Sequence, residues 1–528
     1  MLEGLEISEV MLSSVANNNK SLRIDSTYFV KESEAIDRAL KKSSHFFLKK
    51  AEVVSGPFGS TLKSHSYLQE GVPFVRVQNI KGGFEIQKNE IVYISEKDND
   101  ALKNSQLVVD DLVLSKVGNT IGYYARVDEE LERCNISENN IGIKLSSYYV
   151  ARRHYILAFL NSSYGKTLTL RKISGNAQPK LNVSDINDIP IPQRSEIFES
   201  QISFLIIESR EIKHRSIAIY AQAEALLLKS LGLNHPPLEG GSKSQLAGDS
   251  GRGFNLKTNS NFNSIKKFSD PSPNASHSTL PQGEGNSSQY CYNTSINIKS
   301  FKDSFATTSR LDAEYYQPKY ENYQNHVFSY QEGWSPLEKV CDLKDKNYSP
   351  NDEKFYQYIE LADINKSGGI TGFSKELGKD LPSRARRKVN AGDVLISSIE
   401  GSLSSCAIVG KEFENSLCST GFYVIKSDKI NSETLLVLFK SDLMQNILKQ
   451  SCSGTILTAI NKDEFLKIPL PLINPKTQSQ ISLLIQESFA LKSKSEKLLE
   501  LAKKAVEMAI EESEEGAMKF INQQFYSN

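Results

Sequence analysis

Hydrophobic positions recur at alternating steps of three and four residues in two separate stretches of the chain. The first stretch runs through Ile202, Leu205, Ser209, Ile212, Ser216, Ile219, Ala223 and Leu226. The second runs through Ile481, Leu484, Ser488, Leu491, Ser495, Leu498, Ala502, Ala505 and Ala509. Such spacing predicts helices that pair along a narrow seam, where small serine and alanine side chains let two backbones approach closely. One stretch alone is more typical of an amphipathic surface helix. Two matched stretches favour a pair in which each helix is the partner of the other.

Shorter apolar runs of a different kind precede the first helical stretch. Residues 74–80 and 111–115 are β-type runs closed by glycine or polar turns, as strands are. An Ile-Pro-Ile-Pro sequence follows at residues 189–192, where the prolines end the preceding structure before the helix begins. This order predicts a mixed domain of strands and helices that ends in one long helix.

The same series of elements occurs a second time. Residues 358–364 and 393–397 parallel the two β-type runs, and Ile-Pro-Leu-Pro at 468–471 parallels the proline break. From that break onward the offset is constant, so that Ile202 corresponds to Ile481. A fixed period of this length indicates an internal duplication. The chain therefore contains two copies of one unit, at about residues 22–232 and 309–515.

The duplication predicts the architecture. We expect an α+β protein with two globular mixed α/β domains in tandem, at residues 1–192 and 301–471, each followed by a long helix. The helices, at 193–233 and 472–515, are expected to pair as an antiparallel coiled coil with pseudo-two-fold symmetry. Residues 234–300 are rich in proline, glycine, serine and asparagine, which predicts a flexible linker or insertion. Residues 516–528 would form a C-terminal tail.

Composition limits how this protein could bind other molecules. The 528 residues include 63 lysine and arginine against 63 aspartate and glutamate, which excludes a protein that holds nucleic acid by bulk charge. Any contact with nucleic acid must therefore be local. The six cysteines lie far apart, as reduced intracellular thiols do, and no long apolar window predicts a membrane span. We therefore expect a cytoplasmic protein.

Catalytic sequence patterns are missing. Gly165-Lys166-Thr167 has Leu160 where a phosphate-binding loop requires its first glycine. The seven histidines are not paired at metal-ligand spacing, and there is no Gly-x-Ser-x-Gly elbow. We therefore expect no catalysis by this chain alone, and no cofactor or metal bound to it.

Residues suited to DNA contacts are better represented. Arginine, lysine, asparagine and glutamine can reach base edges or phosphates, although a single basic cluster is more often a solvated surface. Their presence in both copies favours local binding strips. In the first copy the candidates are Lys63, Arg76, Gln78, Asn79, Lys116, Asn119, Arg171, Gln178 and Lys180. In the second copy they are Arg384, Arg386, Arg387, Lys388 and Thr455.

These features, in this order and repeated, carry a family resemblance. Gly-Pro-Phe-Gly-Ser at 56–60, the run at 71–80, the run at 111–115, the paired proline breaks and the duplicated heptad helices together resemble the specificity subunit of type I restriction–modification systems. The resemblance implies that each domain reads one half of a split double-stranded DNA site, and that the two helices separate the domains and dock methyltransferase subunits.

The resemblance also implies partners and a setting. Two modification (methyltransferase) subunits and a restriction (translocase and nuclease) subunit would join this chain in a bacterial or archaeal cytoplasm. S-adenosylmethionine, ATP and Mg²⁺ would belong to those subunits. Two alternatives stay open at this point: a duplicated coiled-coil scaffold that binds only proteins, and a nuclease whose site has no recognised sequence pattern.

Overall fold

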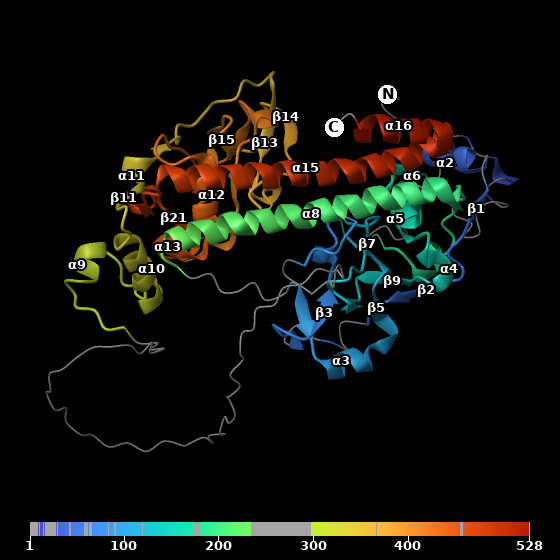
Figure 1. The fold of residues 1–528 in the computed structure, drawn as a ribbon, viewed down its shortest axis with the longest axis horizontal. Helices are drawn as coiled ribbons and strands as arrows, with labels where there is room; N and C mark the ends of the chain where they lie inside the picture. Colours follow the sequence, from blue (N-terminus) through green and yellow to red (C-terminus); the bar gives the residue numbers. More distant parts are fainter. Residues whose placement is uncertain are drawn as a thin grey trace, which may run out of the picture.

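Two globular lobes lie on opposite sides of a pair of long helices in the computed structural model (Figure 1). The structure describes residues 9, 11–13, 15, 28, 30–41, 44–57, 62, 66–82, 84–88, 91–118, 120–173, 180–233, 297–365, 367–454 and 458–526. The first lobe lies beside helix α8 (Glu196–Ser230) and the second beside helix α15 (Pro475–Glu511). Residues 234–296 of the predicted linker lie outside the described residues.

The first lobe contains two four-stranded sheets, ordered β4-β3-β8-β5 and β2-β9-β6-β7. Only β3 and β8 pair in parallel within these sheets. The strands are β2 (Glu52–Ser55), β3 (Val72–Val75), β4 (Val92–Ile94), β5 (Gln106–Val108), β6 (Leu112–Ser115), β7 (Tyr124–Arg126), β8 (Arg133–Ile136) and β9 (Asn140–Lys144). The helices are α2 (Lys31–Lys41), α3 (Glu96–Ala101), α4 (Ser147–Val150), α5 (Arg153–Asn161), α6 (Ser163–Arg171) and α7 (Val183–Ile186), and β1 (His45–Phe46) pairs with β10 (Ile191–Pro192).

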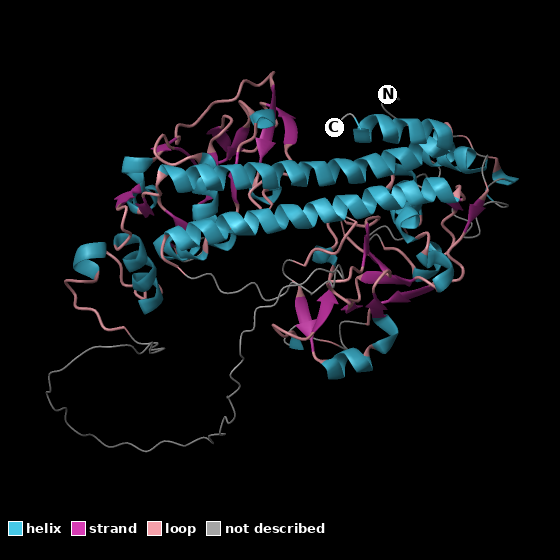
Figure 2. Ribbon diagram, viewed as in Figure 1, coloured by secondary structure: helices cyan, strands magenta, loops and turns pink. Residues whose placement is uncertain are grey.

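The second lobe repeats this topology strand for strand. Its sheets are ordered β14-β13-β18-β15 and β12-β19-β16-β17, and β13 and β18 are the parallel pair. The strands are β11 (Trp334–Pro336), β12 (Asp342–Leu343), β13 (Phe355–Ile359), β14 (Ser374–Leu377), β15 (Ala385–Lys388), β16 (Val394–Ser397), β17 (Cys406–Ile408), β18 (Leu417–Ser419), β19 (Phe422–Lys426), β20 (Cys452–Ser453), β21 (Ala459–Ile460) and β22 (Pro469–Pro471). The helices are α9 (Phe305–Thr308), α10 (Pro318–Phe328), α11 (Leu337–Val340), α12 (Ser432–Lys440), α13 (Asp442–Ser451) and α14 (Lys462–Lys467). The prediction of a mixed α/β fold with long helices is confirmed (Figure 2).

Helix caps define where the long helices begin. The side chain of Ser195 accepts a hydrogen bond from the backbone N–H of Phe198 at the start of α8. Asn474 caps α15 in the same way, and Pro475 occupies the first turn, where its missing N–H costs nothing. The helices therefore begin three residues after the boundaries expected from the sequence, 193 and 472.

Each lobe packs against one end of both long helices. The core of the first lobe includes Ile202 near the start of α8 and Ala502 near the end of α15. The core of the second lobe includes Leu227 near the end of α8 and Ile481 near the start of α15. The helices therefore run in opposite directions, and burial of apolar surface at both ends fixes each lobe to the pair.

The buried stripe departs from the predicted seam towards the helix ends. Leu227 and Ile485 are buried, whereas Leu226 and Leu484 are only half-buried, as is Leu491 near the middle. A straight α-helix drifts relative to a strict heptad repeat, so the inward-facing position moves by one residue. Each helix end also packs against a lobe, which widens the buried face beyond the side that contacts the other helix.

The predicted C-terminal tail is instead a helix, α16 (Glu514–Tyr526). The backbone breaks at Glu512, and α16 then folds back along α15 (Figure 1). Ala517 and Ile521 are fully buried, and Phe525 packs edge-on against Phe204 of α8. Spacing of apolar residues over little more than three turns was too short a signal to predict this helix.

The described cysteines, Cys134, Cys341, Cys406, Cys418 and Cys452, are buried free thiols. Burial raises the pKa of Cys341 to about 12 and that of Cys406 to about 11, so both remain protonated at neutral pH.

Over the described part of the chain, none of the helices has the length and apolar character needed to cross a membrane.

Candidate nucleic-acid interface

A short 3₁₀ turn follows strand β3 and contains three of the predicted contact residues. Asn79 is fully buried: its Oδ1 accepts a hydrogen bond from Arg76 N at 2.9 Å, and its Nδ2 donates to Gln87 O at 3.0 Å. The second lobe has the same turn after β13, where Asp363 Oδ2 accepts from Glu360 N at 2.8 Å. Burial and these hydrogen bonds give Asn79 a role in forming the turn, and its role as a base contact stays a prediction.

Gln78 and Arg76, the other two predicted contact residues of this turn, have side chains that a ligand could reach. Gln78 is exposed. Arg76 is half-buried, and its guanidinium lies 5.6 Å from the ring centroid of Tyr67. An exposed amide beside an arginine on an aromatic ring is a suitable arrangement for contact with a base or a phosphate.

Lys116 and Lys180 are brought together at the end of strand β6. The carbonyl oxygen of Lys116 accepts a hydrogen bond from Leu181 N at 3.2 Å, and its Nζ donates to Ser55 Oγ at 3.2 Å. Burial and the nearby charge of Lys180 lower the pKa of Lys116, although Glu138 acts in the opposite direction. Two cations held this close would be stabilised by a bound anion such as a phosphate.

The equivalent edge of the second lobe has the same backbone hydrogen bond but no lysines at the two equivalent positions. Ile460 N donates to the carbonyl oxygen of Ser398 at 2.8 Å, just as Leu181 N does to that of Lys116. Ser398 and Ala459 thus occupy the places of Lys116 and Lys180. The two lobes therefore present different chemistry at the same structural position.

Arg171 binds its own chain. Its Nε donates to the carbonyl oxygen of Tyr28 at 2.8 Å, and its guanidinium lies 4.1 Å from the ring centroid of the same tyrosine. Gln450 does the same in the second lobe, where its Nε2 donates to Tyr315 O at 3.0 Å. Arg171 therefore anchors an N-terminal segment to α6, and its role as a DNA contact stays a prediction.

Strand β15 carries the predicted basic cluster of the second lobe along the edge of a sheet. Arg384, just before the strand, and Lys388 are exposed, and Arg386 and Arg387 are half-buried. Lys388 Nζ lies 5.7 Å from the ring centroid of Tyr348. The cluster thus forms a basic strip on an edge strand, where the carbonyl oxygen of Arg386 accepts a hydrogen bond from Tyr348 N at 2.7 Å.

Tyrosines beside this strip were not predicted. The hydroxyl groups of Tyr348 and Tyr356 lie 3.3 Å apart, and Lys375 Nζ lies 5.6 Å from the ring centroid of Phe355, which is 62% exposed. Exposed aromatic rings among lysines can stack on bases. The aromatic residues at 355–359, Phe-Tyr-Gln-Tyr-Ile, are the sequence signal that could have drawn attention to this surface.

Arg387 has a different environment from its neighbours. It lies near Asp345, which forms an ion pair with Lys462. The hydrogen bond from Lys462, and to a smaller extent the charge of Arg387, lower the pKa of Asp345. Nη1 of Arg387 is buried and has no hydrogen-bond partner among the described residues.

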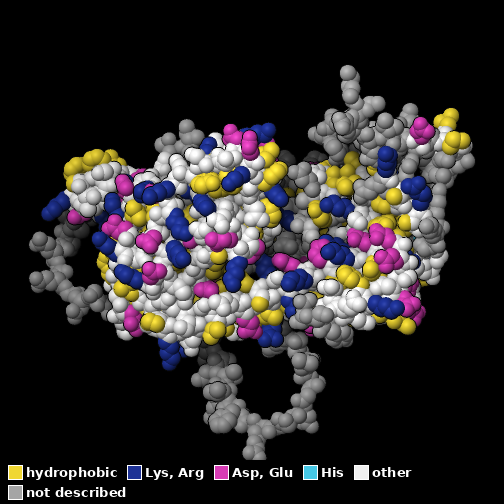
Figure 3. Space-filling model, turned by 90° about the horizontal axis from the view of Figure 1, so that it is seen from above, with side chains coloured by type: hydrophobic (Ala, Val, Ile, Leu, Met, Phe, Trp, Pro, Cys, Tyr) yellow, Lys and Arg dark blue, Asp and Glu magenta, His cyan; other side chains and the backbone are white. Residues whose placement is uncertain are grey.

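Four predicted contact residues, Lys63, Asn119, Gln178 and Thr455, lie outside the described residues. Within the described ranges, no cluster of histidine, cysteine, aspartate and glutamate could hold a metal ion. On the face shown in Figure 3, lysine and arginine are interspersed with aspartate and glutamate. That face therefore offers no single extended basic field.

Part of this chain matches a known protein family. Residues 331–501 match the family model of the type I restriction modification DNA specificity domain, which confirms for this stretch the resemblance seen in the sequence. The S subunit of a type I restriction-modification system from M. genitalium is similar at 11% identity and a TM-score of 0.38, over 88% of this chain and 94% of that chain. The HsdS subunit from Thermoanaerobacter tengcongensis is similar at 14% identity and a TM-score of 0.26, over 89% and 97%. No curated protein matches the chain in sequence.

Proposed function

We propose that this chain is the DNA specificity subunit of a type I restriction–modification complex and reads a bipartite, asymmetric DNA site. The observation that carries the proposal is the repeated topology. The second lobe matches a DNA specificity domain, and the first lobe has the same strand order in both sheets. Two readers of one fold with different surface residues would recognise two different half-sites.

In this proposal, α8 and α15 form an antiparallel coiled coil with a pseudo-two-fold axis between them. Ser209 contacts Ser495, and Ser216 contacts Ser488, across the buried seam. By the offset of the repeat, Ser209 is equivalent to Ser488 and Ser216 to Ser495. Ser209 thus contacts the repeat equivalent of Ser216, and Ser216 contacts the repeat equivalent of Ser209. This reciprocal pattern is that of an isologous two-fold contact.

The helix pair would set the distance between the half-sites. Helix α8 has 35 residues, which at about 1.5 Å each gives a rod of about 50 Å. Lobes attached to opposite sides of such a rod would reach half-sites centred about one DNA turn, or about 34 Å, apart. The base pairs between the half-sites would go unread.

Exposed positions on the long helices are the proposed docking surface for two methyltransferase subunits and a restriction subunit. Ile217 of α8 and Leu483 of α15 are apolar and are 59% and 69% exposed. Exposed apolar residues on the two rods would suit a protein partner. S-adenosylmethionine, ATP and Mg²⁺ would then be bound by those partners, and this chain would supply recognition without catalysis.

Binding-site selection from random duplex DNA, with the methyltransferase partner present, tests the proposal. We expect two short motifs separated by a fixed number of unread base pairs. Gln78→Ala should change the preference in one motif and Arg386→Ala in the other. Lys519→Ala is the matched control, because Lys519 is exposed on α16 and forms an ion pair with Glu515.

Four outcomes would contradict the proposal. A single contiguous motif, or two variants that alter the same bases, would exclude two separate readers. Binding of the partner with no preference for any DNA sequence would instead favour a protein-binding scaffold. Mg²⁺-dependent cleavage of DNA by the purified chain alone would favour a nuclease.

A further inference from the structure

The first lobe meets the middle of α8 through charged side chains. A cavity of about 220 Å³ lies between them and is lined by Glu85, Arg126, Glu129, Arg210 and Lys213, among others. Glu85 lies beyond the turn after β3, and Glu129 lies in the turn between β7 and β8. Arg210, Lys213 and His214 lie on one face of α8, because residues three and four apart are neighbours on a helix.

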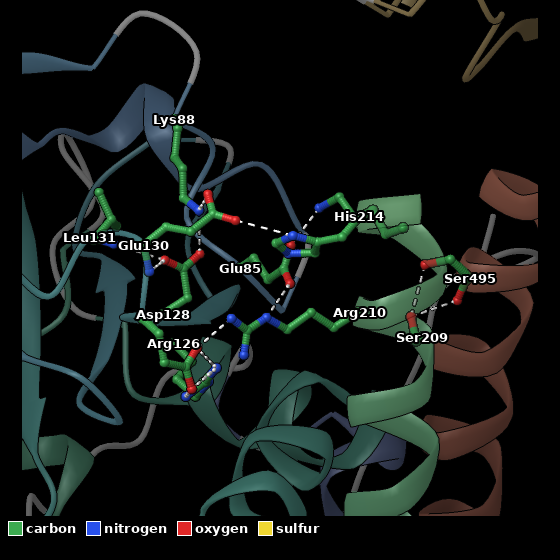
Figure 4. A network of polar contacts seen from close by, with 12 residues as sticks. Glu85, Lys88, Arg126, Asp128, Glu130, Leu131, Ser209, Arg210, His214 and Ser495 are labelled. Atoms are coloured by element: carbon green, nitrogen blue, oxygen red, sulfur yellow. Dashed lines mark hydrogen bonds and ion pairs between the residues drawn. The ribbon is translucent and has the colours of Figure 1, made fainter. Parts of the chain in front are cut away.

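Several ion pairs cross this boundary (Figure 4). The guanidinium of Arg210 pairs with Glu129, and its Nε lies 3.8 Å from Glu85 Oε1. Lys213 Nζ lies 2.5 Å from Glu85 Oε2. The Nδ1 atom of His214 lies 3.1 Å from Glu130 Oε1. We call these six residues, Glu85, Glu129, Glu130, Arg210, Lys213 and His214, the ionic latch.

Two carboxylates of the ionic latch, those of Glu129 and Glu130, also pair with cations of the lobe itself. Arg126 is buried, pairs with Asp110 at 2.6 Å and lies 3.1 Å from Glu129 Oε2. Lys88 pairs with Glu130 and lies 2.8 Å from Asp128. Partial burial acts to raise the pKa of Glu129, but hydrogen bonds from Arg126 and Arg210 lower it to about 2. Glu129 is therefore ionised at neutral pH, and Arg126 of the lobe holds its carboxylate in position to face Arg210.

The second lobe has no counterpart of these ion pairs at its own boundary, as far as the described residues go. Phe489 of α15 replaces Arg210, and Lys492 replaces Lys213, by the offset of the repeat. Lys492 Nζ lies 3.4 Å from Ser367 Oγ, a hydroxyl rather than a carboxylate. Phe489 packs against the core of the second lobe.

The lobe side of the second boundary has changed as well. Arg126 N donates to Phe84 O, and Ile408 N donates to Gly368 O, so Ile408 corresponds to Arg126. The next residue of that loop, Gly369, therefore takes the place of Glu85. Ile408 also packs against the core of the second lobe. One boundary is thus ionic, and its structural equivalent has Phe489, Ile408 and a lysine–serine hydrogen bond in place of the ion pairs.

We propose that Arg210 and Lys213 are positioning residues that set the angle of the first lobe on the helix pair. Apolar packing around α5 fixes one part of the boundary between this lobe and the long helices, and the ionic latch joins the lobe to α8 beside the cavity that α5 also lines. Latch side chains are 18–54% exposed, so salt screens them, whereas apolar contacts persist in salt. The angle of the first lobe therefore depends on ionic strength, and that of the second lobe does not.

This inference deepens the proposed function, because a change of angle would change the spacing between half-sites that the subunit accepts. The orientation itself can be measured without DNA. Failure of the latch and failure of DNA recognition are therefore distinguishable.

Distances between pairs of spin labels on the full chain test the proposal. One pair joins Lys97 of α3 to Ala218 of α8, and the matched pair joins Lys379 to Lys497 of α15, all exposed positions changed to cysteine. Cys291 is replaced by serine, and the buried native thiols stay unlabelled. Raising salt from about 0.1 M to about 1 M shortens the Debye length from about 10 Å to about 3 Å.

We expect the distribution of distances between the first pair of labels to broaden as salt is raised. The distribution for the second pair should stay unchanged. Arg210→Gln combined with Lys213→Gln should raise the displaced population about tenfold at low salt and remove the salt dependence. Arg215→Gln is the matched control, because Arg215 pairs at 2.9 Å with Glu487 of α15 rather than with the lobe. In DNA selection, the latch variant should accept more spacings between half-sites while it keeps both motifs.

An unchanged first pair at high salt would overturn the proposal, as would equal broadening in Arg215→Gln. Equal broadening of both label pairs would show a loss of folding rather than a latch. A latch variant that changed the bases of a motif, and not the spacing, would make Arg210 and Lys213 part of the reading surface instead.

Discussion

Replacement of Ser209 and Ser488 by alanine, one at a time, tests the two-fold relation between the long helices. Ser209 Oγ donates to the carbonyl oxygen of Ser495 at 2.9 Å and lies 2.9 Å from Ser495 Oγ. Ser488 Oγ donates to the carbonyl oxygen of Ser216 at 2.9 Å and lies 3.2 Å from Ser216 Oγ. Both serines are buried and occupy equivalent positions in the repeat. Equivalent contacts predict equal losses of stability.

The size of the loss follows from the hydrogen bonds. Each variant removes two bonds between neutral groups, which contribute about 1 kcal/mol each, and leaves a buried hydroxyl with fewer partners. We expect each single variant to lower the free energy of opening the helix pair by about 1–2 kcal/mol. The double variant Ser209→Ala, Ser495→Ala removes both hydroxyls, so its loss should fall short of the sum of the two singles by about 1 kcal/mol.

Native-state hydrogen exchange of backbone amides in the middle of α8 and α15 is the appropriate measurement. A chain with two lobes need not unfold in one step, and exchange reports the local opening free energy. Ser479→Ala is the control, because Ser479 is exposed on α15 and donates to Pro475 O of its own helix. A large effect of Ser209→Ala beside an effect of Ser488→Ala no greater than the control would refute the two-fold argument. Additive losses in the double variant would refute the direct contact.

Three further predictions concern the lobes. Burial, with the charges of Arg153 and Arg126, lowers the pKa of His154 from 6.5 to about 3, so below pH 6.5 the unfolded chain binds a proton that the native lobe does not. His154 should therefore contribute a fall in stability of about 1.4 kcal/mol per unit as the pH drops from about 6.5 towards 3, seen as the difference in pH slope between the unmodified chain and His154→Leu in urea unfolding. Lys116→Ala should weaken DNA binding equally for all sequences and reduce the slope of log affinity against log salt by about 1, whereas a change of preferred sequence would contradict a phosphate contact. Asn79→Ala should lower the melting temperature through a loss of about 1–3 kcal/mol, and an altered DNA motif without destabilisation would contradict its role in the turn.

The repeated fold could be predicted from the sequence because its signals are local. The heptad positions of α8 and α15 and the β-type runs depend on the spacing of apolar residues, and the duplication shows each signal twice. Helix α16 escaped prediction because Ala517 and Ile521 are buried only once α16 folds back on α15. Its amphipathic pattern is too short to stand out alone.

The roles of charged residues were less accessible. Arg171 stands in a basic stretch, yet it binds Tyr28, which is 143 residues away in the chain. Lys213 binds Glu85 across 128 residues. A local pattern cannot distinguish a cation that faces DNA from one that binds a distant part of its own chain, because both are polar positions on a helix or loop.

Comparison of the two copies separates these roles better than either copy alone. Positions that shape the fold keep their chemistry: Asn79 and Asp363 accept the same backbone hydrogen bond. Positions that do not shape the fold have diverged, as Gln78 has from Ala362 at the middle of the same turn. Because two readers of one fold can recognise different half-sites only through side chains that differ, the bases should be read by exposed, diverged positions. Gln78 meets both conditions and Asn79 meets neither, so residues that the duplication preserves are poor candidates for recognition.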